Sequence, residues 1–235
     1  MASTEHDGGD YRCWSQIDYQ PLVKDLPPSP LLAVMRPGQR VLEIGCGAGY
    51  SLAHLAKIGL EVEGWDINAS VLETARKCVD DAGVGRSITL VAGDFLKCPS
   101  LPRQADAVAL TRVLTCLPKL SDWCMFLARA KQCVKVGGYF YVRDFLVSAD
   151  TYAARYERGR SMGWRYGAFA VPEGKSPPEF IAYHHTQGDI DEICRSLVVI
   201  SLKREEGRSL SGNRVQTFEL LARKPRVERA GVWGR

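Results

Sequence analysis

The sequence has no long hydrophobic run, and none of its stretches approaches the roughly 18 apolar residues that a membrane-spanning helix needs. Its first ten residues, MASTEHDGGD, are polar. They have neither the apolar core of a secretory signal nor the arginine-rich character of a transit peptide. We therefore expect no membrane contact and a cytoplasmic location, with the nucleus as the alternative.

The sequence also lacks closely spaced cysteines, because its eight cysteines are scattered over 235 residues without a CxxC pair. Structural metal sites and disulfide frameworks are built from regularly spaced cysteines, so we expect reduced thiols and no metal. The net charge is only +4, which is less basic than is typical of a dedicated nucleic-acid-binding domain. This balance permits an RNA partner without requiring one.

What the sequence does contain is an alternation of short apolar segments and helical patterns, which is typical of a parallel sheet covered on both faces. Near the C-terminus, two apolar segments follow each other with only a loop between them and predict an antiparallel hairpin. The expected strands are 40–45, 60–66, 87–94, 105–114, 138–145, 197–205 and 215–224. The expected helices are 50–57, 69–81, 120–133 and 187–196.

These patterns divide the chain into one α/β domain with flanking segments. We expect an N-terminal segment and helix over residues 1–37, the domain over 38–224, and a charged tail over 225–235. Within the domain, residues 146–185 are rich in aromatic residues and arginines and are expected to form a lid-like insertion. In the N-terminal segment, the aromatic residues Tyr11, Trp14 and Tyr19 are candidates to pack on the domain or cover a site.

The stretch VLEIGCGAGY, residues 41–50, has the pattern of a strand that ends in a glycine loop. Gly45, Gly47 and Gly49 allow the backbone conformations and close ligand approach that such a loop needs. The helix expected next directs its N-terminal N–H groups at the ligand. Asp66 ends the following strand, where a carboxylate accepts hydrogen bonds from ribose hydroxyls. To this point a dinucleotide such as NAD fits equally well.

Three further positions favour a different ligand. Glu43 lies two residues before the first glycine of the loop. A dinucleotide loop usually carries a third glycine where this sequence has Tyr50. Asp94 ends the third strand, where the amino group of an adenine needs an acceptor. Acidic residues on three adjacent strands suit a ligand that has an amino-acid part, a ribose and an adenine but no pyrophosphate.

As a set, VLEIGCGAGYS, EGWDIN, GDF and the glycine pair before strand 138–145 resemble the motifs of class I S-adenosylmethionine-dependent methyltransferases. The resemblance implies a Rossmann-like α/β fold, namely a seven-stranded, mostly parallel sheet with an antiparallel last strand and helices on both faces. It also implies S-adenosyl-L-methionine as cofactor, and methyl transfer as the reaction. The cofactor residues implied by the resemblance are Glu43, Gly45, Cys46, Gly47, Gly49, Asp66, Ile67, Asp94, Phe95 and Thr111.

The second half is more distantly similar to the tRNA 3-methylcytidine methyltransferases, through RDF at 143–145 and RVQ at 214–216. That similarity implies tRNA as a partner and an RNA base such as cytidine as methyl acceptor, with Asp144 stabilising the charge that develops on the base. In the insertion, cationic side chains including Lys175 would hold phosphates and aromatic rings would stack on bases. The alternative is a lid with solvated arginines. The substrate-binding candidates are Arg112, Arg143, Arg165 and Trp164.

The neighbouring histidines His184 and His185 are candidates to act on an acceptor that must lose a proton, and His185 is taken with Asp144 as a catalytic candidate. Two other functions remain open. The acceptor could be a small molecule or a protein side chain, with a partner protein presenting the substrate. The chain could also bind the cofactor without catalysis, as the partner of another methyltransferase.

Overall fold

The computed structural model describes residues 10–16, 27–172, 180–208 and 213–226. Tyr19, Lys175 and the tail beyond residue 226 lie outside the described residues. Nine strands are described, seven in the main sheet and two in a small second sheet. The strands are β1 (Arg40–Ile44), β2 (Glu61–Asp66), β3 (Ile88–Ala92), β4 (Ala105–Thr111), β5 (Val134–Leu146), β6 (Ala168–Val171), β7 (Phe180–Tyr183), β8 (Val198–Arg208) and β9 (Arg214–Arg223).

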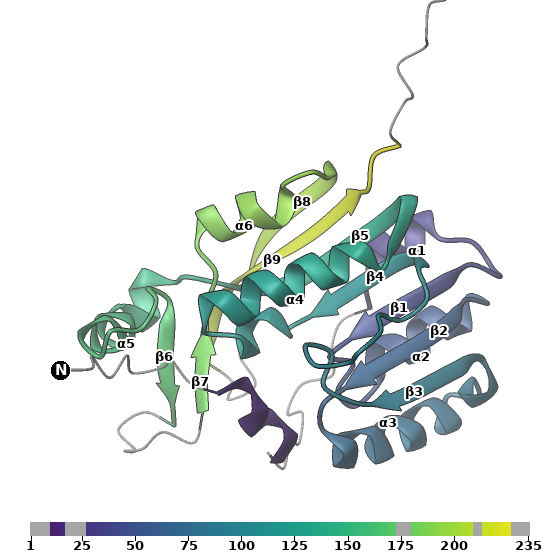
Figure 1. The fold of residues 1–235 in the computed structure, drawn as a ribbon, viewed down its shortest axis with the longest axis horizontal. Coiled ribbons are helices and arrows are strands. Elements are labelled where there is room, and N and C mark those ends of the chain that lie inside the picture. The colour runs from purple at the N-terminus through teal and green to yellow at the C-terminus, as the bar shows by residue number, and fades with distance from the viewer. Residues whose placement is uncertain (1–9, 17–26, 173–179, 209–212, 227–235) are drawn as a thin grey trace, which may run out of the picture.

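The main sheet has the strand order β3-β2-β1-β4-β5-β9-β8 (Figure 1). Strands β1 to β5 pair in parallel, whereas β9 is antiparallel to both β5 and β8. The predicted seven-stranded, Rossmann-like sheet with an antiparallel last strand is therefore confirmed. In such a sheet, ligands bind beyond the carboxyl ends of the strands.

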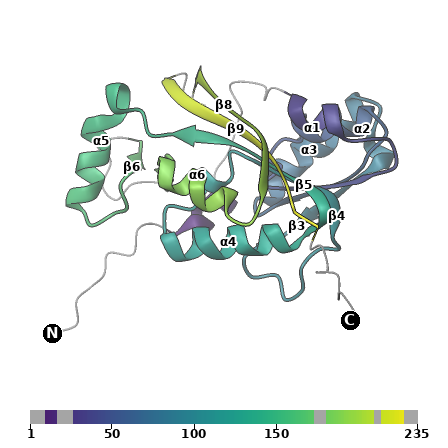
Figure 2. The same cartoon turned by 90° about the horizontal axis from the view of Figure 1, so that it is seen from above.

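Helices cover both faces of this sheet, as Figure 2 shows from above. On one face α4 and α6 bury Trp123 and Ile190 against Phe140 of β5. On the other face α1, α2 and α3 bury Leu31 and Leu52 in a second core. The helices are α1 (Ser29–Val34), α2 (Tyr50–Lys57), α3 (Ala69–Asp81), α4 (Leu120–Gln132), α5 (Ala149–Ser161) and α6 (Gln187–Cys194), with short 3-10 helices η1 (Tyr11–Gln16), η2 (Gly85–Ser87) and η3 (Leu114–Cys116).

The insertion after β5 forms helix α5 and the two-stranded sheet β6-β7, and it lies beyond the carboxyl end of β5 (Figure 1). Tyr152 and Tyr156 of α5 are buried against Phe145 and Phe169, so the insertion has its own aromatic core. Helix η1 lies against β7 through the ring contact of Trp14 with Phe180. The segments 10–16 and 146–185, far apart in sequence, thus meet at one end of the sheet.

Two strand boundaries differ from the prediction for local physical reasons. The strand expected over 105–114 ends at Thr111, because Arg112 has a left-handed backbone with φ of 55° and η3 follows. The strand expected from residue 138 begins at Val134. Val134 already pairs with Ala105, and an irregularity in the register lets the strand continue past the glycines. A bulge of this kind cannot be predicted from the hydrophobic periodicity of the sequence.

Candidate functional site

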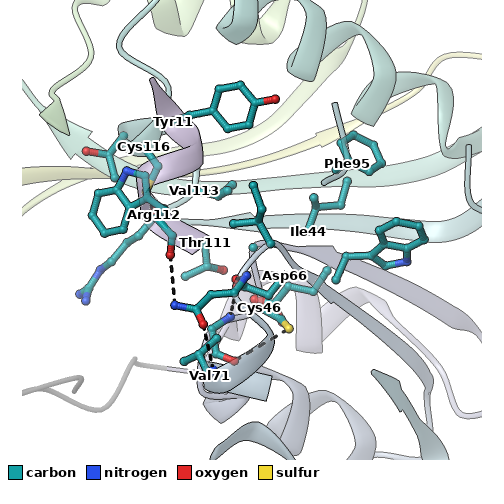
Figure 3. Close-up of a pocket in the computed structure, with 18 of the residues that line it drawn as sticks. Tyr11, Ile44, Cys46, Asp66, Val71, Phe95, Thr111, Arg112, Val113 and Cys116 are labelled. Atoms are coloured by element: carbon teal, nitrogen blue, oxygen red, sulfur yellow. Dashed lines mark hydrogen bonds between the residues drawn. The ribbon is translucent and has the colours of Figure 1, made fainter. Parts of the chain in front are cut away.

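A pocket opens at the carboxyl ends of β1 to β5 (Figure 3). One part is lined by residues that follow β1, β2 and β3 and that were predicted to bind the cofactor. The other part is lined by residues from η1, from the segment 111–117 after β4, and by Phe145 of β5. These two parts are called the cofactor half and the acceptor half below.

The glycine loop after β1 is shaped by close packing on one side and open space on the other. A Cβ atom at Gly45 would lie 2.4 Å from a methyl group of Val113, so no larger residue fits there. A Cβ at Gly47 would meet nothing within 4 Å, and the φ of 50° at this residue exposes the loop backbone to the pocket. The loop therefore has the form of a cradle for a ligand that approaches the main chain.

Asp66, at the end of β2, ties the glycine loop to the start of α3. Its carboxylate accepts hydrogen bonds from the backbone N–H of Gly47 at 2.8 Å and of Asn68 at 2.9 Å. Burial raises the pKa of Asp66, and the backbone N–H donors oppose this rise. Asn68 in turn caps α3 through the N–H groups of Ser70 and Val71. A carboxylate fixed in this way faces the pocket with its remaining lone pairs.

The other two predicted acids also line the cofactor half. Glu43 is buried in β1 and accepts a hydrogen bond from the Ser51 hydroxyl of α2. Asp94 follows β3 and accepts hydrogen bonds from the Leu96 N–H at 3.0 Å and from the Tyr11 hydroxyl at 2.8 Å. The structure thus brings together the acids of three adjacent strands, and Tyr11 of η1 contacts one of them.

The rest of the cofactor half is apolar. Phe95 is buried with its ring centroid 5.1 Å from that of Phe126 and 6.3 Å from that of Trp65. Ile67 lines the pocket as predicted, and so does Cys46, whose thiol pKa is raised well above its ordinary value by burial. A flat apolar ring such as adenine fits between walls of this kind.

The buried polar atoms of the acceptor half include Thr111 Oγ1 and Trp14 Nε1, which have no hydrogen-bond partner among the described residues. Unsatisfied buried polar groups are rare in folded proteins and call for a ligand or a solvent molecule. Figure 3 shows Thr111 close to Asp66, with Tyr11 and Cys116 on the opposite side of the pocket from Cys46. Thr111 therefore lies where the two halves meet.

Asp144, predicted to be catalytic, lies behind this wall and is not among the described residues that line the pocket. Its carboxylate accepts hydrogen bonds from the N–H of Thr115 at 3.1 Å and of Phe145 at 2.8 Å. Burial raises its pKa to about 7, while backbone donors and Arg112 oppose the rise. In this position Asp144 holds the pocket wall in place.

The structure places both histidines in the protein core, which corrects the expectation that they face the acceptor. His185 is fully buried, its Nε2 accepts a hydrogen bond from Trp123 Nε1 at 3.1 Å, and its Nδ1 lies 3.1 Å from the Phe145 carbonyl. His184 Nδ1 lies 2.7 Å from the Tyr156 hydroxyl. Burial lowers the pKa of each histidine to about 3, so both are neutral at physiological pH.

Of the four predicted substrate-binding residues, the structure brings only Arg112 to the described pocket. Arg165 forms an ion pair with Asp189 and stacks over the ring of Tyr183 at 4.3 Å. Trp164 packs against the small core of β6 and β7. Arg143 is buried in β5. The contacts of these three side chains lie within the insertion and the sheet, so they stabilise those parts of the fold and do not reach the pocket.

The prediction did not assign Asn68, Cys116 or Phe145 to the site, and it gave Tyr11 and Trp14 only as candidates to cover one. Asn68 could have been found, since an Asn directly before a helix commonly caps it and this one follows the carboxylate that was expected to bind the ribose. Cys116 and Trp14 have no such signal, because only the folding of η1 and η3 onto the sheet edge brings them to the pocket.

Comparison with known proteins agrees with this geometry. A family model described as a methyltransferase domain matches residues 42–142, which include the whole cofactor half but neither η1 nor Phe145 of the acceptor half. A sterol 24-C-methyltransferase of Gibberella zeae is 29% identical over 48% of this chain. A demethylmenaquinone methyltransferase of Corynebacterium kroppenstedtii is 32% identical over 47% of it. The matched segments span 30% and 43% of these two relatives.

Solved structures share the fold over most of the chain. A SAM-dependent methyltransferase of Methanosarcina mazei has a TM-score of 0.75 and 22% identity, covering 86% of this chain and 99% of its own. The N-methyltransferase NodS of Bradyrhizobium japonicum, in complex with S-adenosyl-L-homocysteine, has a TM-score of 0.58 and 17% identity. The match covers 90% of this chain and 91% of NodS. Residues 42–142 thus match a methyltransferase domain in sequence, and the solved methyltransferase structures share the fold of the chain.

The described residues contain no helix with the length and apolar character that a bilayer span requires. They also hold no cluster of three or more histidine, cysteine or acidic side chains arranged to bind a metal ion.

Proposed function

We propose that this chain, whose methyltransferase domain carries a complete cofactor site, catalyses the transfer of a methyl group from S-adenosylmethionine to a small molecule. The observation that supports this most directly is the continuity of the pocket, in which the acids Glu43, Asp66 and Asp94 share one space with Thr111, Arg112 and Phe145. A site of this form places an acceptor beside the cofactor, and positioning is the larger part of the catalysis that such a transfer needs.

Each residue of the cofactor half has a proposed task. The loop around Gly47 receives the ligand with its backbone, Asp66 binds the ribose hydroxyls, and Asp94 accepts from the adenine amino group, with Phe95 beside the ring. Thr111 supplies a hydroxyl where the halves meet. When bound, S-adenosylmethionine supplies a methyl group already activated by a sulfonium leaving group. The protein must therefore orient the acceptor and exclude water, which the apolar walls do.

A small acceptor is favoured over an RNA base because three arginines in the described part of the insertion have partners away from the pocket. Arg165 is paired with Asp189, Arg160 with Glu157, and Arg155 stacks over Tyr152 and Phe169. An RNA site would instead need a basic path for the phosphate backbone to the pocket. Arg112 is the single cation among the described residues of the pocket.

The described residues of the acceptor half include no histidine or carboxylate that could act as a general base. Glu43, Asp66 and Asp94 are all on the cofactor half, where they are committed to fixed partners. An acceptor whose nucleophilic atom carries a free lone pair, such as an amine nitrogen or a sulfur, reacts without proton removal in the bond-forming step. We therefore propose that the atom that receives the methyl group is a nucleophile of this kind.

The proposal is tested by an acceptor screen with isotopically labelled S-adenosylmethionine. Three acceptor pools are offered separately, namely a small-metabolite mixture, total tRNA and a protein extract. We expect labelled product from the small-metabolite pool, abolished in Asp66→Ala and retained in the matched control Glu73→Ala on the exposed side of α3. Product from tRNA or protein alone would contradict the small-molecule assignment. If no pool gives product while the cofactor binds, the chain is a non-catalytic partner instead.

A further inference from the structure

A second cleft lies at the opposite end of the main sheet from the pocket. It is formed by the segment before β1, the start of β5 and the end of β9, which Figure 1 shows together beside α1. Its volume is about 350 Å³, which is in the range of small-ligand sites. Among the described residues it shares none with the pocket. This cleft is called the basic cleft below, because its charged lining residues are Asp106 and the cations Arg36, Lys135, Arg223 and Arg226.

The acid in the described lining of the basic cleft is already paired. Asp106 accepts a hydrogen bond from Lys135 Nζ at 2.8 Å and another from the backbone N–H of Arg40 at 2.9 Å. Asp106 and Lys135 therefore compensate each other's charge. The positive charge that remains in the described lining is that of the three arginines.

Two of these arginines converge on one point of the chain, the turn at Gly137. A Cβ atom at Gly137 would lie 3.2 Å from Arg226 Nε and 3.9 Å from an outer guanidinium nitrogen of Arg223, so both guanidinium groups flank this glycine. Arg223 Nε also donates to the Gly137 carbonyl at 3.0 Å, which fixes the position of its guanidinium. Like charges this close repel each other, and an anion between them replaces the repulsion with attraction.

The guanidinium groups of the basic cleft are available to a ligand. Within residues 10–16, 27–172, 180–208 and 213–226, no carboxylate pairs with Arg36, Arg223 or Arg226. The side-chain oxygen of Gln39, which also lines the cleft, accepts the backbone N–H of Arg36 at 2.7 Å, so the amide NH₂ of Gln39 is a further donor. The basic cleft therefore presents a group of N–H donors with uncompensated positive charge.

We propose that the basic cleft binds a small phosphate-bearing molecule, with the phosphate held between Arg223 and Arg226 and with Arg36 as the third cation of the site. Guanidinium groups present paired N–H donors whose spacing matches phosphate and carboxylate oxygens. A phosphate group suits three arginines better than a carboxylate does, because it carries up to about two charges and three acceptor oxygens. The site goes beyond the proposed methyl transfer and does not depend on it, because it lies at the other end of the sheet.

Calorimetric titration of the full chain with inorganic pyrophosphate, at constant ionic strength, tests this site. The variants are Arg226→Gln, Arg223→Gln and the control Arg160→Gln, which removes one positive charge from the exposed surface of α5. Arg226 follows β9, so its replacement should leave the sheet intact, and urea unfolding verifies that each variant is as stable as the wild type. Citrate, whose charges are carboxylates, and a short single-stranded RNA are titrated for comparison.

We expect one saturable pyrophosphate site per chain, with an affinity about tenfold lower in Arg226→Gln and Arg223→Gln and within about twofold of the wild type in Arg160→Gln. No saturable binding, or an equal loss in all three variants, would overturn the proposal. Citrate binding as tight as that of pyrophosphate would overturn the phosphate assignment. RNA binding much tighter than that of pyrophosphate would overturn the small-molecule assignment in favour of a nucleic acid. None of these outcomes bears on the proposed methyl transfer, which the acceptor screen tests.

Discussion

The two halves of the pocket differ in how the chain builds them. The cofactor half comes from three consecutive strand ends, within residues 43–51, 65–71 and 93–96. Each of its acids lies within two residues of the end of a strand, and backbone N–H groups or a nearby hydroxyl hold it. The acceptor half combines η1 with the 111–117 segment and Phe145, so residues more than 100 positions apart meet there. Local sequence thus specifies the first half and long-range packing the second.

This difference explains why the predicted cofactor residues met in one place whereas the predicted substrate residues did not. A strand end in a parallel sheet has only one edge to occupy, so acids at strand ends must converge. Arg165, in contrast, could point to the pocket or to the insertion. It points to the insertion, where it forms an ion pair with Asp189 and stacks over the ring of Tyr183.

The largest effect is expected for the cofactor half. Asp66→Ala removes the carboxylate that would bind the ribose and that also holds the N–H groups of Gly47 and Asn68. Losing charged hydrogen bonds of this kind costs roughly 3 kcal/mol, or about 100-fold in affinity. Calorimetry with S-adenosylhomocysteine measures it, with Glu73→Ala as control. Unchanged affinity in Asp66→Ala would refute the site assignment.

The free energy of unfolding should decrease at acidic pH, because three buried titratable groups lie next to the acceptor half. His184 and His185, with pKa values lowered by burial to about 3, hold fewer protons in the folded state than when unfolded, so their stabilisation is lost as the pH falls below about 6.5. Asp144, with its pKa raised by burial to about 7, acts in the opposite direction over the same range. From pH 6.5 to pH 5, two histidines remove about 2 kcal/mol each and Asp144 returns about 2 kcal/mol.

Urea unfolding at both pH values measures this balance. We expect a net loss of roughly 2 kcal/mol in the wild type and about 4 kcal/mol in Asp144→Asn, in which the opposing carboxyl no longer titrates. An Asp144→Asn variant with the same pH dependence as the wild type would show that Asp144 titrates normally in the folded protein.

Trp14→Phe should weaken binding of the acceptor but not of the cofactor, with a smaller effect than the changes above. It keeps the aromatic contact with Phe180 but removes the buried N–H, so the KM for the acceptor should rise about 5- to 10-fold, corresponding to roughly one hydrogen bond. Affinity for S-adenosylhomocysteine should change less than twofold. Trp164→Phe, in the insertion core, is the matched control. An equal rise in both variants would mean that Trp14 only supports the fold.

The smallest effect is expected on the outer face of the insertion. The double change Arg158→Gln and Arg160→Gln removes two positive charges from the last turn of α5. Because a small acceptor does not reach this surface, steady-state kinetics should show kcat and KM within twofold of the wild type. A tenfold rise in KM would favour an RNA or other polyanionic acceptor, since such ligands depend on backbone charge contacts.

Much of the fold followed from the sequence pattern, including the seven strands of the main sheet and the antiparallel position of the last. The ends of β4 and β5 did not, because the left-handed Arg112 and the bulge near Ala105 depend on contacts between strands. In the site, the acids and glycines of the cofactor half could be predicted as a group. His185 could not be placed, because whether a histidine faces a pocket or bonds to Trp123 depends on packing.

The cofactor half could be located from the residue pattern, since a glycine loop after one strand and acids at or near the ends of three leave the backbone little freedom in where the ligand lies. The acceptor half depends on how distant segments pack together. The tertiary structure brought Trp14 against Phe180 at the edge of the pocket and paired Arg165 of the insertion with Asp189, away from the pocket. The physical reason is that a strand followed by a glycine turn or an acid is specified by neighbouring residues in the sequence, whereas the partner of a long side chain is decided by what folding brings within its reach.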